Sequence, residues 1–212
     1  MRRAAIEEQN RYLLERQRHF RAAADVVCEA WAAFAEVQAV AVIGSVAKML
    51  WKEVPRFREF RRERIEVWHE CGDLDLALWL DCQQRLGELR QAGDKALRAA
   101  YEKGTGISVV GHQLDVFLFE PGSDHYLGRL CSFNRCPKDK PDCIVPGCGA
   151  IPFNKRIVEF TPRADLLAGA GETMLYRRDV GRLRSALDLP TPIEATDEGR
   201  TKNRHPNCDG TS

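Results

Sequence analysis

Three short apolar segments, separated by much longer polar ones, constrain the fold of this chain most. They cover residues 39–43, 74–80 and 107–119 and are rich in Val, Leu and Phe. Short apolar runs bounded by glycine or polar turns are typical of strands buried in a sheet. Strands that alternate with longer segments of helical periodicity predict an α/β (α+β) protein, with a mixed sheet and flanking helices.

The segment before the first strand, residues 2–37, contains neither glycine nor proline and predicts one long helix. Its apolar residues recur every seven positions, but two of the four companion positions are polar, Asn10 and Gln17. A coiled coil needs both sets of positions to be apolar. We therefore expect the helix to pack along the domain, and a homodimer through this helix is the alternative.

Four regions follow from this pattern: an N-terminal helix packed on the core (1–37), the core itself (38–124), a cysteine-rich loop with a helical extension (125–189) and a tail expected to be disordered (190–212). Within them, the sequence predicts helices over residues 55–70, 83–103 and 164–188, and a short strand over 156–160.

Composition excludes several classes of protein. The chain has 212 residues, and its 44% hydrophobic residues exclude a mostly disordered chain. A net charge of +1 gives no compositional indication of nucleic-acid binding. No apolar run approaches the ~18–20 residues of a membrane helix, and the first ten residues lack the apolar stretch of a secretory signal. We expect a cytoplasmic protein with no membrane contact.

Aspartates interrupt two of the three apolar segments. Asp73 and Asp75 alternate with leucines, so both carboxylates lie on one face of the strand while the leucines enter the core. Asp115 lies in an apolar run, where a carboxylate needs a partner. If the two strands are neighbours, three carboxylates converge, and such oxygen ligands suit Mg²⁺. Taken singly, Asp73 could instead cap a turn, and Asp75 could pair with an arginine between residues 56 and 64.

The first strand ends in Gly44-Ser45. Glycine allows the backbone to approach phosphates closely, and Ser45 with the following helix N-terminus offers hydrogen-bond donors to them. Lys48 is a further candidate phosphate contact. Gly-Ser after a buried strand, Asp73-x-Asp75 on the next and Asp115 on a third together resemble the nucleotidyltransferase superfamily of DNA polymerase beta, in particular its minimal and antibiotic nucleotidyltransferases.

The resemblance covers about residues 38–120 and implies a mixed α/β core with a magnesium-dependent active site. In this arrangement Asp73 and Asp75 bridge two Mg²⁺ ions and hold the triphosphate, and Asp115 completes the ion that activates the attacking hydroxyl. The implied enzyme moves a nucleoside monophosphate from a nucleoside triphosphate such as ATP to an acceptor hydroxyl and releases pyrophosphate.

The chain departs from the family in the spacing between Ser45 and Asp73, which is longer than in relatives. We interpret the extra residues as an insertion that contains the helix expected over 55–70. The charged residues between Lys52 and Glu70 are interpreted as a solvated face, with a ligand patch as the alternative.

Four of the eight cysteines, Cys131, Cys136, Cys143 and Cys148, lie in a segment rich in proline and glycine. Such a segment buries little apolar surface, and a structural Zn²⁺ ion held by the four thiolates would order it. Free or paired cysteines and an iron–sulfur cluster are the alternatives.

The acceptor is the least constrained part of the predicted reaction. Balanced charge favours a small molecule or a protein hydroxyl over a long nucleic acid, because basic grooves normally hold the latter. A non-catalytic nucleotidyltransferase-like binding or regulatory module, for example a partner in a toxin–antitoxin-type pair, is the alternative to an enzyme. In that case the carboxylates are structural.

Overall fold

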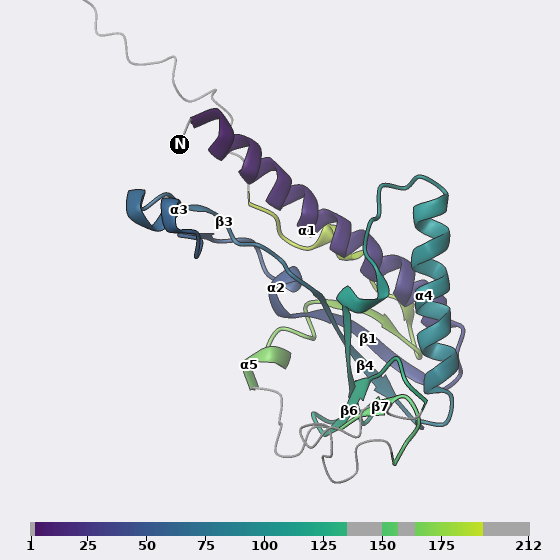
Figure 1. Cartoon of the computed structure of the whole chain (residues 1–212). Coiled ribbons are helices and arrows are strands. Elements are labelled where there is room, and N and C mark those ends of the chain that lie inside the picture. The colour runs from purple at the N-terminus through teal and green to yellow at the C-terminus, as the bar shows by residue number, and fades with distance from the viewer. Residues whose placement is uncertain (1–2, 135–149, 157–163, 193–212) are drawn as a thin grey trace, which may run out of the picture.

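A computed structural model describes residues 3–134, 150–156 and 164–192 of the chain (Figure 1). Its main sheet has the strand order β7-β6-β5-β4-β1-β8-β9, in which only the β4–β5 pair is parallel. The mixed α/β class expected from the sequence is confirmed. The strands are β1 (Val37–Ile43), β4 (Leu74–Leu80), β5 (Leu114–Phe119), β6 (Tyr126–Leu130), β7 (Asn154–Lys155), β8 (Met174–Arg177) and β9 (Gly181–Arg182).

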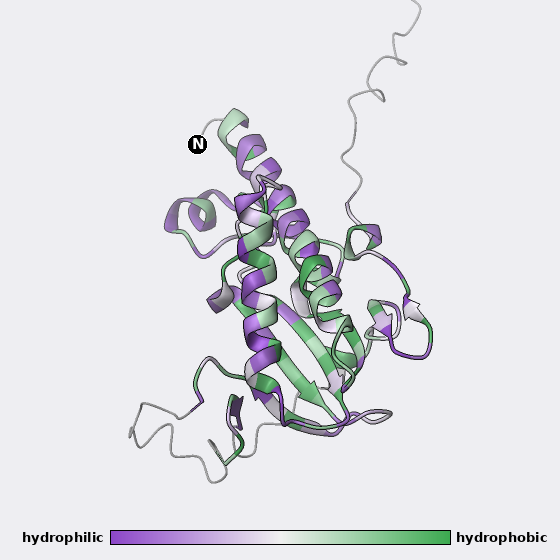
Figure 2. Ribbon diagram, turned by 90° about the vertical axis from the view of Figure 1, so that its right-hand side faces the viewer, coloured by the Kyte–Doolittle hydropathy of each residue, from purple (hydrophilic) through white to green (hydrophobic). Residues whose placement is uncertain are grey.

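Two long helices, α1 (Arg3–Ala32) and α4 (Leu86–Glu102), cover one face of the sheet. Figure 2 faces this layer and shows them side by side over the strands. The indole Nε1 of Trp31 on α1 donates to the Leu89 carbonyl of α4 at 2.8 Å. The heptad positions Leu13, Phe20 and Val27 are buried. The N-terminal helix thus packs along the domain, as the sequence predicts.

The strands present alternate residues to the two faces of the sheet. Val42, Leu76 and Val116 belong to the core under the helices, whereas Ala77 and Phe117 belong to a second cluster on the opposite face. Asp75 of β4 lies two residues before Ala77, and Asp115 of β5 lies two residues before Phe117. By the same alternation both aspartates lie on the face that α1 and α4 leave uncovered.

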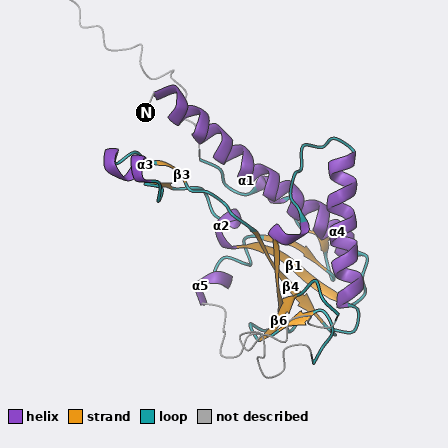
Figure 3. Cartoon of the chain, viewed as in Figure 1, coloured by secondary structure: helices purple, strands orange, loops and turns teal. Residues whose placement is uncertain are grey.

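The region expected to be a helix over 55–70 is different in the structure, and that prediction is wrong. β2 (Lys52–Glu53) and β3 (Val67–Trp68) pair as a small second sheet, and α3 (Arg58–Glu63) is a short helix between them. We call residues 51–70 the arm. Figure 3 shows it projecting from the main sheet beside the N-terminal half of α1.

Tertiary contacts explain why the arm is not one helix. Arg64 adopts a left-handed conformation with φ 51°, which ends α3. The Trp68 amide then donates to Asn10 Oδ1 of α1 at 2.8 Å, and Val67 is buried. Pairing with α1 and β2 outweighs the helical periodicity of the segment.

The helix expected over 164–188 is also wrong. The segment contains the short helix α5 (Ala164–Leu167), then β8 and β9, and the 3-10 helix η3 (Ala186–Asp188). β8 pairs with β1, which without it would be an edge strand. The free hydrogen-bonding groups of β1 therefore select a strand where periodicity alone indicates a helix.

The third expected strand is shorter than predicted, because residues 111–113 form the 3-10 helix η1 and β5 starts at Leu114. β6 lies where the sequence indicates only a cysteine-rich loop. Most of the strand expected over 156–160, and the tail from residue 193 onward, lie outside the described residues. None of the helices that the structure describes combines the length and the hydropathy needed to span a bilayer.

Candidate functional site

The parallel pairing of β4 with β5 places Asp75 directly beside Asp115. Asp73 immediately precedes β4 and is exposed. Both neighbouring aspartates act electrostatically on Asp75. The three carboxylates selected from the sequence are therefore brought together at the starts of two adjacent strands.

The surroundings of Asp75 favour the protonated form of its carboxyl group. Burial, followed by the negative charge of Asp115, raises its pKa to about 6. Arg129 opposes this shift, and Asp73 adds to it. Two carboxylates held side by side in this way retain negative charge that a bound cation would relieve.

Arg129 on β6 is a site residue that sequence reasoning missed. Its Nη1 donates to Asp115 Oδ2 at 3.1 Å, and its guanidinium lies 4.2 Å from the ring centroid of Phe117. A prediction of strand β6 from the sequence would have identified Arg129, because alternation along that strand places its side chain on the same face as the aspartates. From the sequence this segment is interpreted as part of a cysteine-rich loop, and the residue is therefore missed.

Gly44 brings the backbone against the Asp75 carboxylate. It opens the short helix α2 (Gly44–Ala47) with φ +70°, and a Cβ at this position would lie 2.3 Å from Asp75 Oδ2. Ser45 hydrogen-bonds the thiol of Cys71; burial raises the pKa of that thiol, and the hydrogen bond partly offsets the increase. The predicted Gly44-Ser45 element thus contacts the strand that carries the carboxylates.

Two buried side chains of α1 hold the Gly44–Lys48 segment from behind. Gln17 Nε2 donates to the Lys48 carbonyl at 2.8 Å. Arg21 donates from Nε to the Val46 carbonyl at 3.0 Å and from Nη2 to the Lys48 carbonyl at 3.1 Å. Gln17 is one of the two polar residues that interrupt the coiled-coil pattern. Its side-chain amide holds the Gly44–Lys48 segment in place.

A cavity of about 630 Å³ opens next to Gly44 and Lys48. Its size falls within the range of small-molecule sites. Polar groups at its wall include Glu172, Thr173 and Arg184, among apolar residues that include Ile43 and Leu166. The cavity is large enough to accept a nucleoside beside the Gly44-Ser45 element.

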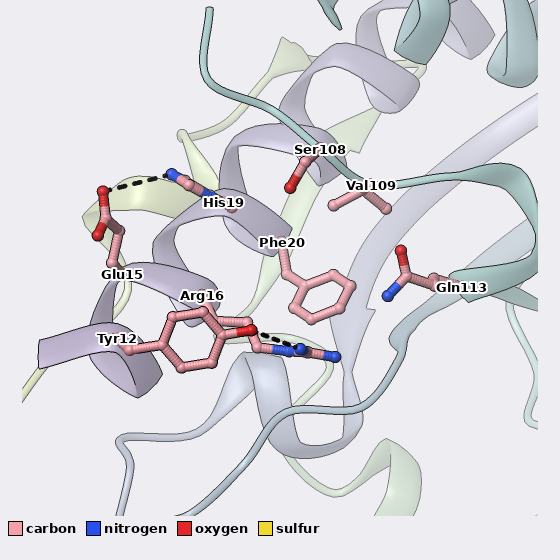
Figure 4. A pocket seen from close by; sticks show the side chains of 8 residues that line it. All are labelled: Tyr12, Glu15, Arg16, His19, Phe20, Ser108, Val109 and Gln113. Carbon is pink, nitrogen blue, oxygen red and sulfur yellow. Dashed lines mark hydrogen bonds and ion pairs between the residues drawn. The ribbon is translucent and has the colours of Figure 1, made fainter. Parts of the chain in front are cut away.

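A smaller cavity of about 230 Å³ lies between α1 and residues 108–113 (Figure 4). Within it, Arg16 Nη1 donates to Tyr12 Oη at 3.1 Å, and His19 Nε2 lies 3.8 Å from Glu15 Oε1. This cavity lies on the side of the sheet that α1 covers. Asp75 and Asp115 lie on the other face, so the two sites are separate.

The chemistry of the donors is compatible with magnesium. Among the described residues, no group of three or more His, Cys, Asp or Glu side chains is arranged to hold a metal ion. Magnesium is, however, commonly bound by one or two carboxylates together with substrate phosphates. Asp75 and Asp115 supply such a pair, and a bound triphosphate would supply the remaining oxygens.

The zinc interpretation stays a prediction. Cys131 follows β6 and is a free, partly exposed thiol. Cys136, Cys143 and Cys148 lie outside the described residues.

The raised pKa of Asp75 predicts a pH dependence of stability in the metal-free protein. The carboxyl binds its proton up to about pH 6 when folded but only to about 3.8 when unfolded, so stability falls as pH rises between these values. At pH 7.5 with EDTA, we expect Asp75→Asn to raise the free energy of unfolding by about 1 to 2 kcal/mol, after allowance for partial solvent exposure. At pH 4 the variant and wild type should differ little. Urea titrations at both pH values measure this, and equal differences at the two would contradict it.

Gly44→Ala should destabilise the protein more than Gly104→Ala. Both glycines have φ +70°, which costs an alanine about 1 to 2 kcal/mol. Gly104 has nothing within 4 Å of an added Cβ, whereas at Gly44 that atom would meet Asp75. We expect an additional loss of about 1 to 3 kcal/mol at Gly44, measured by urea unfolding. Equal losses in the two variants would show that Gly44 has no close contact with the carboxylate.

Comparison of the chain with protein-family models, with curated proteins and with solved structures finds no match.

Proposed function

We propose that this protein is a magnesium-dependent nucleotidyltransferase, which moves a nucleoside monophosphate from a nucleoside triphosphate to an acceptor hydroxyl and releases pyrophosphate. The observation that carries the proposal is the direct lateral pairing of Asp75 with Asp115, with the Gly44 backbone against the Asp75 carboxylate. The resemblance in the order of these motifs supports the same reaction.

In this proposal Asp75 and Asp115 would hold magnesium together with oxygens of the triphosphate, and Asp73 beside them would contribute the third carboxylate that the resemblance implies. Bound magnesium supplies positive charge to the phosphates and lowers the pKa of the attacking hydroxyl. Gly44, Ser45 and Lys48 would bind the phosphates, and the cavity lined by Gly44 and Lys48 would accept the nucleoside. Arg129 balances part of the charge of Asp115 throughout.

The reaction forms one bond and breaks one. The acceptor oxygen bonds to the α-phosphorus, the bond from that phosphorus to the β-phosphate oxygen breaks, and pyrophosphate leaves. The hydroxyl proton passes to water. Holding acceptor and triphosphate in line is the main contribution that the chain itself makes.

The test is incubation of the full chain with each of the four α-³²P-labelled nucleoside triphosphates and Mg²⁺, with and without cell extract as a source of acceptor. We expect label to be transferred from at least one of them and EDTA to abolish the transfer. No transfer from any triphosphate, together with no thermal stabilisation by magnesium and nucleotide, would overturn the proposal.

A non-catalytic binding module is the second candidate. The observation in its favour is that Arg129 already provides Asp115 with an ion-pair partner at 3.1 Å. Thermal shift separates the two candidates, because a ligand that binds only the folded state stabilises it. Magnesium with nucleotide should raise the melting temperature of a transferase, and it should leave a module with structural carboxylates unchanged.

A further inference from the structure

The tip of the arm, residues 56–64, carries an excess of positive charge, although the arm as a whole has six basic and five acidic residues. Residues 56–64 contain five arginines, two glutamates and two phenylalanines. All five arginines are exposed, and their guanidinium groups make no ion pair with any residue that the structure describes. These arginines are Arg56, Arg58, Arg61, Arg62 and Arg64.

Two of the five carboxylates of the arm have partners at its base, and the other three, Glu59, Glu63 and Glu66, lie near the arginines in sequence. Glu53 Oε2 lies 3.0 Å from His69 Nδ1, and Glu70 Oε1 lies 3.7 Å from Arg16 Nη1 of α1. Both glutamates are at the base of the arm. On α3, Arg58, Arg61 and Arg62 have the i, i+3, i+4 spacing of one helical face, whereas the two glutamates occupy the adjacent face. The tip therefore presents a face of guanidinium groups.

Aromatic rings accompany this charge. Phe57 is 69% exposed, with its ring centroid 6.3 Å from that of Phe60. Nearer the base, Trp51 is 41% exposed and stacks on His69 at 3.9 Å. Exposed rings beside guanidinium groups are suited to stacking unpaired bases while binding phosphates.

Both ends of the arm lead to the carboxylate site. One end follows Lys48, close in sequence to Gly44, and the other precedes Cys71, two residues before Asp73. Arg16 Nε of α1 donates to the Cys71 carbonyl at 2.8 Å and fixes that end. Figures 1 and 3 show the arm, with α3 and β3, extending from the main sheet beside α1. A polymer bound along the arm would thus have one end near Asp73, Asp75 and Asp115.

We propose that the arm binds the single-stranded end of a nucleic acid and presents its terminal hydroxyl as the acceptor. Binding by the arm stands on the arm's own residues, and the acceptor role rests on the proposed function. The terminal hydroxyl oxygen bonds to the α-phosphorus, pyrophosphate leaves with the broken phosphoanhydride bond, and the hydroxyl proton passes to water. The net charge of the chain favours a smaller acceptor, but the excess positive charge of residues 56–64 favours a polyanion beside the site.

The first test measures binding without catalysis. Fluorescence anisotropy follows a labelled single-stranded RNA of about 12 nucleotides as it binds the full chain at several salt concentrations. The variant Arg58→Gln/Arg61→Gln/Arg62→Gln should lose at least about tenfold in affinity at low salt and reduce the salt slope by about 2. The control Arg18→Gln/Lys95→Gln/Arg98→Gln removes the same charge from exposed positions of α1 and α4 and should stay close to wild type.

Stacking is tested separately from charge. Phe57→Ala should weaken RNA binding by about fivefold or more, because one base loses its aromatic partner. Tyr101→Ala, which removes a ring that is 66% exposed at the end of α4, is the matched control and should have little effect. A Phe57→Ala variant that binds like wild type would overturn stacking at the arm.

The remaining outcomes distinguish the two proposals. Nucleic-acid binding by the arm is overturned if wild type binds the RNA no more tightly than the arginine variant does. It is also overturned if poly-glutamate displaces the labelled RNA as well as unlabelled RNA does. If transfer to another acceptor is still observed in that case, the proposed function stands without nucleic-acid binding by the arm. If RNA binds the arm and no nucleoside monophosphate is transferred from any triphosphate, the proposed function fails and the arm remains a nucleic-acid-binding element. Extension of the labelled RNA by wild type, lost in the arm variant, supports both.

Discussion

Asp75→Asn should reduce magnesium-dependent nucleotide transfer by at least about a thousandfold. The amide keeps the size of the side chain but removes the charge that, in the proposed mechanism, would hold magnesium between triphosphate and protein, a contribution of several kcal/mol to the transition state. Asp73→Asn should have an effect in the same direction. Transfer of labelled nucleotide at saturating Mg²⁺ measures the loss.

The fold should survive this change, because the Asp75 carboxylate destabilises the metal-free protein at neutral pH. Circular dichroism and urea unfolding therefore separate loss of activity from loss of structure. Asp124→Asn is the control: it removes an exposed carboxylate from the turn between β5 and β6 and should keep full activity. Full activity in either Asp75→Asn or Asp73→Asn would exclude the carboxylates from the chemistry.

The positions of these aspartates could be predicted from the sequence because the signal is local. Alternation of Asp73 and Asp75 with leucines shows which face each side chain occupies, and the short apolar run that contains them predicts the strand that the structure shows. The sequence left one condition open, namely that β4 and β5 are neighbours in the sheet. A strand, a crossover helix and a parallel strand form one such adjacent unit, and α4 is that helix.

The parts that the sequence did not predict depend on contacts between distant segments. β8 is a strand because β1 offers it a free edge, and the arm is a hairpin because Asn10 and Val67 fix β3 against α1. Arg129 joined the site only through the pairing of β6 with β5. Helical periodicity in a single segment does not contain this information, since tertiary pairing decides between alternatives of similar local propensity.

Arg21 is the clearest case of a residue whose role only the tertiary structure reveals. It is one of the many charged residues of the N-terminal helix, yet it is fully buried, with 0% exposure. Besides Val46 and Lys48, it donates to the carbonyls of Leu189 at 2.7 Å and Pro190 at 3.1 Å. Burial lowers the pKa of its guanidinium. One side chain thus connects α1, the segment after β1 and the end of the described chain.

Arg21→Ala should cost about 3 to 5 kcal/mol of unfolding free energy. The substitution leaves buried carbonyl groups without donors and opens a cavity the size of the lost side chain. Arg21→Lys keeps the charge but cannot reach several carbonyls at once, and it should cost about 1 to 3 kcal/mol. Because this variant should fold, it provides the test even if Arg21→Ala does not fold. Urea unfolding at pH 7.5 measures both losses.

Arg18→Ala is the matched control, since Arg18 lies one turn earlier on α1 and is exposed. It should change stability by less than about 0.5 kcal/mol. Because Arg21 and Gln17 position the segment that carries Gly44 and Ser45, Arg21→Lys should also weaken the stabilisation by magnesium and nucleotide, beyond its effect on the unliganded protein. If Arg21→Lys responds to magnesium and nucleotide as wild type does, Arg21 stabilises the fold without positioning the Gly44–Lys48 segment for a ligand. If Arg21→Ala is as stable as Arg18→Ala, the four carbonyl contacts do not hold these segments together.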